Sequence, residues 1–380
     1  MHVALAVILL CFLAFANGAN DNFKGVATLF GSGTSDYKRA LAWATLTTAL
    51  GSLAALVLAK GLLVTFSGKG VVPTAVLSLK SFPLAVGFAA AVTVMLATRF
   101  GFPISTTHAL VGGLAGAGLV ASSSGIQVGR LIETFFLPLV ISPFIAILGT
   151  AALYPALRKI GRLAGIRKQT CLCVGTKIVG VVPQGLSPQQ ALMALPGIPE
   201  ISLGTEAQCV ERYQGRLWGM NVGTLLDKLH YVSAGAVGFA RGLNDTPKIA
   251  ALLLTGNGFG LPFSVIGVGA LMAVGGILSA RKVAHTMSLR ITDMNHAQGF
   301  AANLVTGFLV IFASEMGMPV STTHVSCGSL FGIGAATGTA RWRTIAGILA
   351  SWVITLPVAA VLGGLFFWIF RNQPLLGGAS

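Results

Sequence analysis

The sequence predicts an all-α polytopic membrane protein made of two inverted-topology repeats, with broken helices or re-entrant hairpins at its centre. Hydrophobic residues make up 54% of the 380-residue chain and charged residues only 9%, against about 25% charged residues in a soluble domain. Apolar runs long enough to cross a bilayer recur from one end of the chain to the other. Two polar motifs each occur twice in the same order, which indicates an internal duplication.

Ten apolar segments account for most of the chain, and each has about 20 residues or more, the length that a helix needs to cross the hydrocarbon core. We expect the first segment to be retained, because neither a basic n-region nor a small-residue cleavage site accompanies it. Five segments precede a more polar central stretch and five follow it. The expected ranges are 3–23, 40–60, 83–101, 103–121, 131–156, 229–255, 262–280, 299–317, 319–338 and 344–370.

The central stretch, residues 157–228, is predicted to be a cytoplasmic loop because it is rich in Lys and Arg, which mark the cytoplasmic side of a membrane. Five crossings before the loop then place the N-terminus outside, and five after it place the C-terminus outside. The expected organisation is a first membrane repeat at 1–156, the loop at 157–228 and a second membrane repeat at 229–380. We expect the protein to lie in the plasma (inner) membrane.

The formal net charge of +15 would suggest a nucleic-acid partner in a soluble chain. Here the basic residues lie mostly between apolar runs, so we interpret them as topological anchors and expect no nucleic acid. Cys171, Cys173 and Cys209 in the central stretch form a weak candidate metal site, because no clustered His or fourth Cys accompanies them. Free thiols are the preferred interpretation.

The duplication involves both polar motifs. "GANDNFKG" at 18–25 matches "GLNDTPKI" at 242–249, with the Asp residues 224 positions apart, and "GFPISTTHALVGG" at 101–113 matches "GMPVSTTHVSCGS" at 317–329, 216 positions apart. Because each half holds five segments, the second half enters the membrane in the opposite direction. Inverted repeats are common in secondary transporters, which hold their substrate near the bilayer midplane where the halves meet.

The Asn-Asp motifs predict a cation path. A charged group within a spanning segment costs at least about 2.5 to 3.5 kcal/mol, so Asp21 and Asp245 need a cation or a proton. Asn20 and Asn244 add carbonyl oxygens, which suit hard cations. All four are candidate cation ligands, and the two Asp residues are candidate metal ligands if the ion is Na+. The alternative is that Asp21 caps a short helix at the membrane interface. The glycines expected to let each helix break are Gly18, Gly25 and Gly242.

Lys24 and Lys248 each follow an Asp of the motif by three residues. They could pair with these carboxylates, attract an anion, or anchor the segment by snorkelling to lipid headgroups. The residue types alone leave these three interpretations open.

The Ser-Thr-Thr-His motifs predict an anion site. Pro103 and Pro319 fit helix starts, and each helix end then presents hydroxyls and free N–H groups to a ligand. Two such ends facing each other would hold one tetrahedral oxyanion. The alternative is that the hydroxyls bond back to their own helices. His108 and His324 would relay protons or hold the turn by hydrogen bonds. The candidate hydroxyl ligands are Ser105, Thr106, Thr107, Ser321, Thr322 and Thr323.

The paired G-x-N-D and P-x-S-T-T-H motifs around a hydrophilic loop resemble the inorganic phosphate transporter (PiT) family of cation–phosphate symporters. The resemblance covers nearly all of the chain except 157–228. It implies a homodimer in which the Ser-Thr-Thr segments are re-entrant hairpins lining a phosphate site. The resemblance implies that Asn20, Asp21, Asn244 and Asp245 are ion and phosphate ligands and that the six hydroxyl residues bind phosphate. We add Lys24 and Lys248 to the expected phosphate-binding residues.

Two departures from the family pattern bear on the coupling ion and the substrate. The usual first motif resembles G-A-N-D-V-A-N-A, whereas this chain has Lys24 where small residues are expected. A fixed lysine there could replace a sodium ion electrostatically, which makes proton coupling credible. The second motif usually has Gln-Lys after the Asn-Asp pair, whereas this chain has Pro247 before the lysine.

The substrate could also be sulfate, which matches phosphate in size and shape. Only phosphate can donate a hydrogen bond, and it would do so to an acceptor such as Asp21 or Asp245.

The predicted function is a secondary active transporter, a symporter that moves inorganic phosphate coupled to a Na+ or H+ gradient. The alternatives are a sulfate or related oxyanion permease on the same scaffold and an uncoupled anion channel. An enzyme is disfavoured, because no H-E-x-x-H or G-x-S-x-G motif lies in a fitting context. The expected partners are phosphate, the coupling cation and the lipid bilayer, with no cofactor.

Overall fold

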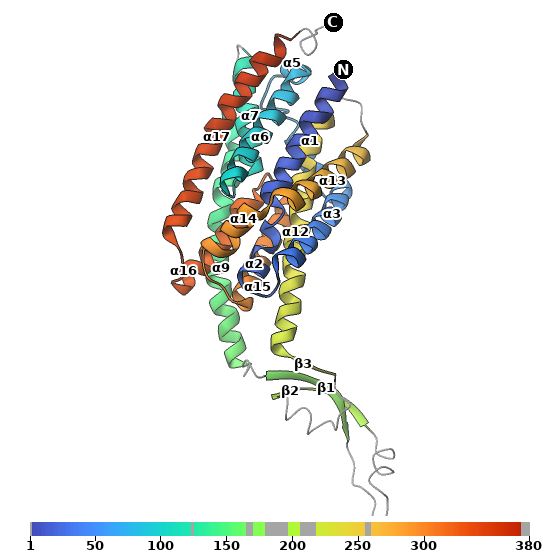
Figure 1. Ribbon diagram of the computed structural model, residues 1–380, viewed down its shortest axis with the longest axis vertical. Coiled ribbons are helices and arrows are strands. Elements are labelled where there is room, and N and C mark those ends of the chain that lie inside the picture. The colour runs from blue at the N-terminus through green and yellow to red at the C-terminus, as the bar shows by residue number, and fades with distance from the viewer. Residues whose placement is uncertain are drawn as a thin grey trace, which may run out of the picture. The chain divides into compact units, whose positions relative to one another are not determined.

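The computed structural model describes residues 2–122, 125–164, 170–178, 197–205, 218–254 and 260–373 (Figure 1). The chain divides into two compact units. One combines Met1–Tyr154 with His230–Ser380, and the other is Pro155–Leu229.

The first half of the membrane unit follows the expected order of apolar segments. Its long helices are α1 (His2–Asp21), α3 (Tyr37–Leu58), α6 (Ser81–Phe100), α7 (Thr106–Ala121) and α9 (Leu137–Leu163). The short elements η1 (Lys24–Val26), α2 (Ala27–Gly31), α4 (Lys60–Thr65) and α5 (Thr74–Leu77) lie between them, and α8 (Val128–Leu131) and the π-helix η2 (Ile132–Phe136) lead directly into α9.

The second half repeats this order. Its long helices are α12 (Val222–Leu254), α13 (Leu261–Ser279), α15 (His296–Glu315), α16 (Thr322–Thr337) and α17 (Trp342–Arg371), with the short α14 (Arg281–His285) and η3 (Thr286–Arg290) after α13. Each of the ten predicted apolar segments therefore coincides with a helix, and the helical membrane fold is confirmed. The inverted orientation of the two halves stays a prediction.

Six helices in the described part of the chain are long and apolar enough to cross a membrane. They are α3, α6, the continuous run Val128–Leu163, α13, α15 and α17. By contrast, α7 and α16 have 16 residues each, which corresponds to roughly 24 Å, less than the hydrocarbon core of about 30 Å. Each of these two short helices forms a hairpin with the helix before it, as the packing of α6 on α7 and of α15 on α16 shows.

The two halves interlock. Helix α17 of the second half packs along α6 and α7 of the first half, and α13 packs on α1 and α3 (Figure 1). Small residues permit this close approach. A Cβ atom built on Gly116 of α7 would lie 1.8 Å from the Ala360 carbonyl oxygen of α17, and one built on Gly332 of α16 would lie 2.4 Å from the Ile147 oxygen of α9. The final helix of each half thus packs against the hairpin of the other half.

The two Asn-Asp motifs differ in local structure. α1 ends at Asp21 and the 3₁₀ turn η1 follows, so the first motif does break its helix. α12 instead runs through the second motif with Pro247 inside it, so the break expected there is absent. A proline forfeits one backbone hydrogen bond, and tertiary packing on both sides of the motif holds the helix together.

The motif glycines are packing contacts and not hinges. None of Gly18, Gly25 and Gly242 is among the glycines with positive φ. A Cβ atom on Gly18 would lie 1.9 Å from the Met272 carbonyl oxygen, and one on Gly242 would lie 2.1 Å from the Thr48 oxygen. The break expected at Gly242 is therefore absent, while Gly25 lies in the turn that follows the break at Asp21, and close helix contact accounts for these glycines without a positive φ.

The second unit contains a three-stranded antiparallel sheet in the order β2–β1–β3. The strands are β1 (Thr170–Ile178), β2 (Gly197–Thr205) and β3 (Trp218–Asn221), and the register pairs Cys173 of β1 with Ser202 of β2 and Gly219 of β3. The sheet lies within the central loop, outside the two repeats predicted to be helical. Of the candidate metal ligands, Cys171 and Cys173 fall in β1 and Cys209 lies outside the described residues.

Candidate functional site

The Ser-Thr-Thr-His motifs form the starts of α7 and α16. Ser105 is the N-cap of α7, and its hydroxyl accepts a hydrogen bond from the His108 backbone N–H at 3.1 Å. Ser321 caps α16 in the same way, accepting from the His324 N–H at 3.2 Å. The predicted helix starts are therefore present, although each proline precedes the cap and does not occupy the first turn. Both serine hydroxyls serve their own helix.

The two turns meet in the interior of the protein. The Thr323 hydroxyl donates to the Ile104 carbonyl at 2.8 Å, and the Thr107 hydroxyl donates to the Val320 carbonyl at 3.4 Å. In each pair a threonine of one half contacts the residue just before the capping serine of the other half. The exchange is reciprocal, as expected where two copies of one motif face each other.

Lys24 is the central contact of the first Asn-Asp motif. Its ammonium forms a salt bridge with Asp21 and donates to the Asn20 side-chain oxygen and the Ile104 carbonyl, both at 2.8 Å, and to the Thr323 hydroxyl at 2.5 Å. Only 3% of the residue is exposed. The salt-bridge interpretation therefore holds, and the headgroup-anchoring interpretation is wrong, because the side chain points into the protein and not toward lipid.

Lys248 makes the equivalent contacts in the second motif. Its ammonium donates to the Val320 carbonyl at 2.7 Å and to the Thr107 hydroxyl at 2.9 Å, and it lies 3.6 Å from the Asp245 carboxylate. Anchoring is wrong here as well, since the residue is 1% exposed. Each lysine thus bonds the carbonyl before the capping serine of its own half and the last threonine hydroxyl of the other half.

The motif asparagines hold the turns in place. The Asn20 amide donates to the Thr98 hydroxyl at 2.8 Å and to the Phe102 carbonyl at 3.0 Å. The Asn244 amide donates to Asp245 and to the Val320 carbonyl, and its oxygen accepts from the Ser314 hydroxyl at 3.1 Å. Both amides are satisfied by the protein, so in this conformation they position the turns. Their service as ion or phosphate ligands stays a prediction.

Asn17 connects the two carboxylates, a role that the sequence did not suggest. Its amide nitrogen lies 3.0 Å from Asp21 Oδ2, 3.3 Å from Asp245 Oδ2 and 3.0 Å from the Thr106 hydroxyl oxygen. Its side-chain oxygen accepts from Arg241 Nη2 at 2.6 Å. One buried amide therefore joins both Asp residues to a hydroxyl turn and to a cation.

Arg241 supplies a third buried cation. Its Nε lies 3.6 Å from Asp245 Oδ2, and its Nη1 donates to Asn22 at 2.9 Å and to Thr48 at 3.3 Å. The residue is 1% exposed. Asn17 and Arg241 are themselves 224 positions apart, the spacing of the Asn-Asp motifs. Arg241 was visible in the sequence just before the second motif, and extending the repeat by one residue before the first glycine would have identified Asn17 as its counterpart.

The buried charges leave one positive charge in excess. In the part of the chain that the structure describes, the buried Lys, Arg, Asp and Glu side chains are Asp21, Lys24, Arg241, Asp245 and Lys248. Three are cations and two are carboxylates. Burying net charge is costly unless it is compensated, so this cluster favours an anion as its further partner.

The first threonines of the two motifs differ. The Thr106 hydroxyl donates to Asp21 Oδ2 at 3.2 Å, whereas the Thr322 hydroxyl, in a residue that is 5% exposed, has no hydrogen-bond partner among the described residues. Backbone N–H groups at a helix start also lack partners within the helix. The Thr322 hydroxyl and the first-turn N–H groups of α16 other than that of His324, which Ser321 accepts, are therefore donors that remain for a ligand.

The two histidines lie where the turns meet the last helices of both halves. Their rings lie 4.4 Å apart between centroids, and the His324 ring stacks on Trp352 of α17 at 3.9 Å. His324 Nδ1 lies 3.3 Å from the Leu139 carbonyl of α9, and Trp352 Nε1 donates to the Pro103 carbonyl at 3.0 Å. The contacts of His324 favour the turn-holding interpretation over a proton relay, whereas His108 Nδ1 and His324 Nε2 have no hydrogen-bond partner among the described residues.

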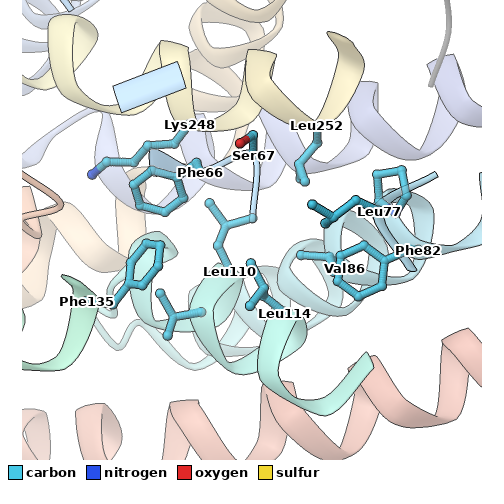
Figure 2. A pocket seen from close by; sticks show the side chains of 12 residues that line it. Phe66, Ser67, Leu77, Phe82, Val86, Leu110, Leu114, Phe135, Lys248 and Leu252 are labelled. Carbon is cyan, nitrogen blue, oxygen red and sulfur yellow. The ribbon is translucent and has the colours of Figure 1, made fainter. Parts of the chain in front are cut away.

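An apolar pocket lies beside Lys248 (Figure 2). Its lining includes Phe66, Leu110 and Phe135, and its polar lining residues are Ser67 and Lys248. The Lys248 ammonium lies 5.5 Å from the centroid of the Phe66 ring. A doubly charged oxyanion would lose its hydration in such surroundings without replacement. We therefore place the candidate anion site at the facing turns and not in this pocket.

Comparison with known proteins agrees with this geometry. The sequence model of the phosphate transporter family matches residues 17–363, which include all four motifs. This chain belongs to the phosphate transporter family. It is therefore an integral, multi-pass membrane protein of a family of transporters and not of enzymes, and the resemblance noted from the motifs is confirmed.

The relatives match over nearly the whole chain. The chloroplastic inorganic phosphate transporter 2-1 of Arabidopsis thaliana is 28% identical over 420 residues, covering 95% of this chain and 71% of the relative. A putative phosphate permease of Haemophilus influenzae is 28% identical over 406 residues, covering 95% and 94%. A putative phosphate permease of Pyrococcus horikoshii is 26% identical over 403 residues, covering 96% and 97%.

One solved structure shares the fold. A protein described as the sodium-dependent phosphate transporter superimposes with a TM-score of 0.71 at 21% identity, and the match covers 97% of this chain and 99% of that one. At this identity the match establishes the architecture, and the chemistry of the site has to be argued from the residues of this chain.

Proposed function

We propose that this protein is a symporter that moves inorganic phosphate across the membrane, coupled to a cation gradient. The observation that carries the proposal is the meeting of two hydroxyl-bearing helix starts beside a buried cluster with one excess positive charge. Helix starts offer N–H groups to an anion, and the excess charge offsets part of the cost of its desolvation. The phosphate permeases among the relatives support the same substrate.

The carboxylates support phosphate over sulfate. Asp21 Oδ2 and Asp245 Oδ2 both lie next to Asn17, and Asp21 accepts from Thr106 of the first hydroxyl turn. Phosphate at neutral pH keeps a proton that it can donate to such an acceptor, whereas sulfate brings only acceptors and would face the carboxylate with no hydrogen to share. Rejection of this kind by a polar site can be strong.

Proteoliposome uptake tests the proposal. Labelled phosphate and labelled sulfate are supplied separately, with a proton gradient, a sodium gradient or neither. We expect accumulation of phosphate above its equilibrium level under one of the gradients and little uptake of sulfate. Equal accumulation of both ions would indicate a general oxyanion permease, and equilibration without accumulation under every gradient would indicate a channel.

The placement of the protein in the membrane also remains to be tested. We propose a homodimer in the plasma membrane, with both termini outside and residues 157–228 in the cytoplasm. Labelling of single cysteines introduced at Lys38 and at Arg343 in intact cells, together with cross-linking of the purified protein, checks orientation and assembly. The proposed orientation places both positions on the cytoplasmic side, so labelling of either from outside would overturn it.

A further inference from the structure

The surroundings of Lys24 resemble those of a bound metal cation. Four oxygens lie around its ammonium: the Asp21 carboxylate, the Asn20 amide oxygen, the Ile104 carbonyl and the Thr323 hydroxyl. An ammonium has three protons to donate, so the protein offers it more oxygens than it has hydrogens. Carboxylate and carbonyl oxygens are the ligands that hard cations take in proteins.

The position of these four oxygens in the fold also resembles that of a cation site. α1 ends at Asp21, and the unpaired carbonyls at a helix end carry partial negative charge. Unwound backbone and helix C-terminal ends are where secondary transporters coordinate sodium ions or protons. The Lys24 ammonium lies at such an end and takes a backbone carbonyl from the facing turn, so it occupies the place of an inorganic cation.

The second lysine provides an internal contrast. The Lys248 ammonium has two close oxygens, from Val320 and Thr107, with Asp245 at 3.6 Å and the Phe66 ring at 5.5 Å. α12 continues through this motif, so the motif presents no helix C-terminal end to the ammonium, which instead contacts the starts of α7 and α16. Unlike the Lys24 ammonium, that of Lys248 makes no hydrogen bond to the asparagine of its motif, and no carboxylate oxygen of the described residues lies within hydrogen-bond distance of it. Its surroundings therefore do not resemble an ion shell, and the inference concerns Lys24 alone.

We propose that Lys24 is a tethered cation whose ammonium permanently fills the cation position of the first Asn-Asp motif. Sodium does not enter this position in the natural protein. Removal of the lysine side chain opens the shell, and the remaining oxygens then bind a monovalent cation from solution. For transport, where the inference rests on the proposed function, phosphate uptake is independent of Na+ and the coupling cation is the proton.

The first experiment uses the unaltered protein. Initial rates of phosphate uptake into proteoliposomes are measured under a fixed inward proton gradient, with Na+ or choline as the external cation. We expect equal rates in the two salts. Accumulation driven by a sodium gradient alone would overturn the inference and leave the proposed function standing. Failure to accumulate phosphate under any gradient would overturn the proposed function, and the binding experiment would then decide the inference.

The binding experiment compares two truncations of Lys24 that differ in volume. Thermal unfolding of detergent-purified protein is followed during titration with NaCl or choline chloride. Lys24→Ala opens the shell, and we expect its Tm to rise saturably with Na+ by at least about 2 °C, because a ligand that binds only the folded state stabilises it. Lys24→Met removes the charge but keeps the volume, so its Tm and that of the unaltered protein should not distinguish Na+ from choline.

Three outcomes judge the binding claim. A sodium-specific response of the unaltered protein as large as that of Lys24→Ala would overturn it, as would a folded Lys24→Ala protein without any sodium response. Lys24→Asn, which keeps a side-chain oxygen at the position, is the second variant if the alanine protein cannot be purified, and the same sodium response is expected. The exposed Lys38→Ala variant is the control for the general effect of removing a lysine.

Discussion

The two Asn-Asp motifs carry the same residues at the same spacing, yet they stand in different local structures. In the first, α1 ends at Asp21 and Lys24 reaches its own carboxylate directly. In the second, α12 is continuous, and Asp245 lies 3.6 Å from both Lys248 and Arg241. The two copies therefore place the same side chains at the centre of the protein. They differ in backbone structure and in the number of cations around each carboxylate.

The position before each motif shows the divergence most clearly. Asn17 and Arg241 are equivalent in the repeat and contact each other across it at 2.6 Å. An amide in one half and a guanidinium in the other convert an otherwise balanced cluster, two lysines against two carboxylates, into one with excess positive charge. The two facing turns come from Ser-Thr-Thr-His motifs that are the same in both repeats. The excess positive charge that favours an anion comes from Arg241, which has no charged counterpart in the first repeat.

Neutralising either carboxylate should have the largest effect on transport. Asp21→Asn and Asp245→Asn each leave a buried cation without its counterion, which costs about 3 to 5 kcal/mol for a buried pair. We expect each variant to lose phosphate uptake by at least about 100-fold, while expression is maintained. Uptake into proteoliposomes and size-exclusion profiles check this.

The two carboxylate variants should differ in one respect. Asp21 has one close cation and Asp245 has two at longer range, so Asp21→Asn should lower thermal stability more. Asp36→Asn is a matched control, because Asp36 is an exposed N-cap of α3 and Asn caps equally well. Normal uptake in both Asp21→Asn and Asp245→Asn would show that the carboxylates are structural.

Removing the asymmetric charge should have the next largest effect. Arg241→Asn gives both halves the same residue at this position and cancels the excess positive charge. We expect the apparent KM for phosphate to rise by about 10-fold or more, the scale of about 1.4 kcal/mol, with Arg241→Lys intermediate because it keeps the charge without the guanidinium fork. Concentration-dependent uptake measures this, and an unchanged KM in a folded Arg241→Asn protein would refute the role of the charge.

The two threonines offer a finer contrast. Thr322 has no partner among the described residues, whereas Thr106 donates to Asp21. Thr322→Val should therefore raise the apparent KM for phosphate by about 3-fold to 10-fold with little change in Tm. This rise corresponds to about 0.7 to 1.4 kcal/mol, the net contribution of one ordinary hydrogen bond. Thr106→Val should raise KM as well and also lower stability by about 1 kcal/mol. An unchanged KM in both would argue against direct contact with the anion.

The sequence predicted the helices better than it predicted the contacts at the site. Ten apolar runs located ten helices, because segments that cross or enter the hydrocarbon core must be apolar and satisfy their own backbone, and the repeated motifs located the centre. The break expected in both Asn-Asp motifs occurs only at Asp21, and the copy that carries Pro247 stays helical. Local propensity is overridden there by packing against neighbouring helices.

The contacts that sequence reasoning missed are of two kinds. Ile104 and Val320 take part through backbone carbonyls, which leave no trace in residue type, so only the folded structure shows them. Asn17 and Arg241 were visible in principle, since they extend the repeat by one position, but different residue types at equivalent positions do not register as a motif. Identical residues in the two repeats reveal a duplicated site. The residues that set the net charge of that site can lie at positions where the two repeats differ.

The capping serines should give the smallest effect and the sharpest test of symmetry. Ser105→Ala and Ser321→Ala each remove one N-cap hydrogen bond, which costs about 1 kcal/mol. Each serine oxygen accepts the cap bond while its O–H stays available as a donor, so the N-cap role alone predicts a lowered Tm of similar size in both and an unchanged KM. Ser→Gly at the same positions, which costs only a few tenths of a kcal/mol, is the matched control. A rise in KM without loss of Tm would instead assign the serines to the anion, as the motif alone had suggested, and would mean that the caps open when phosphate binds.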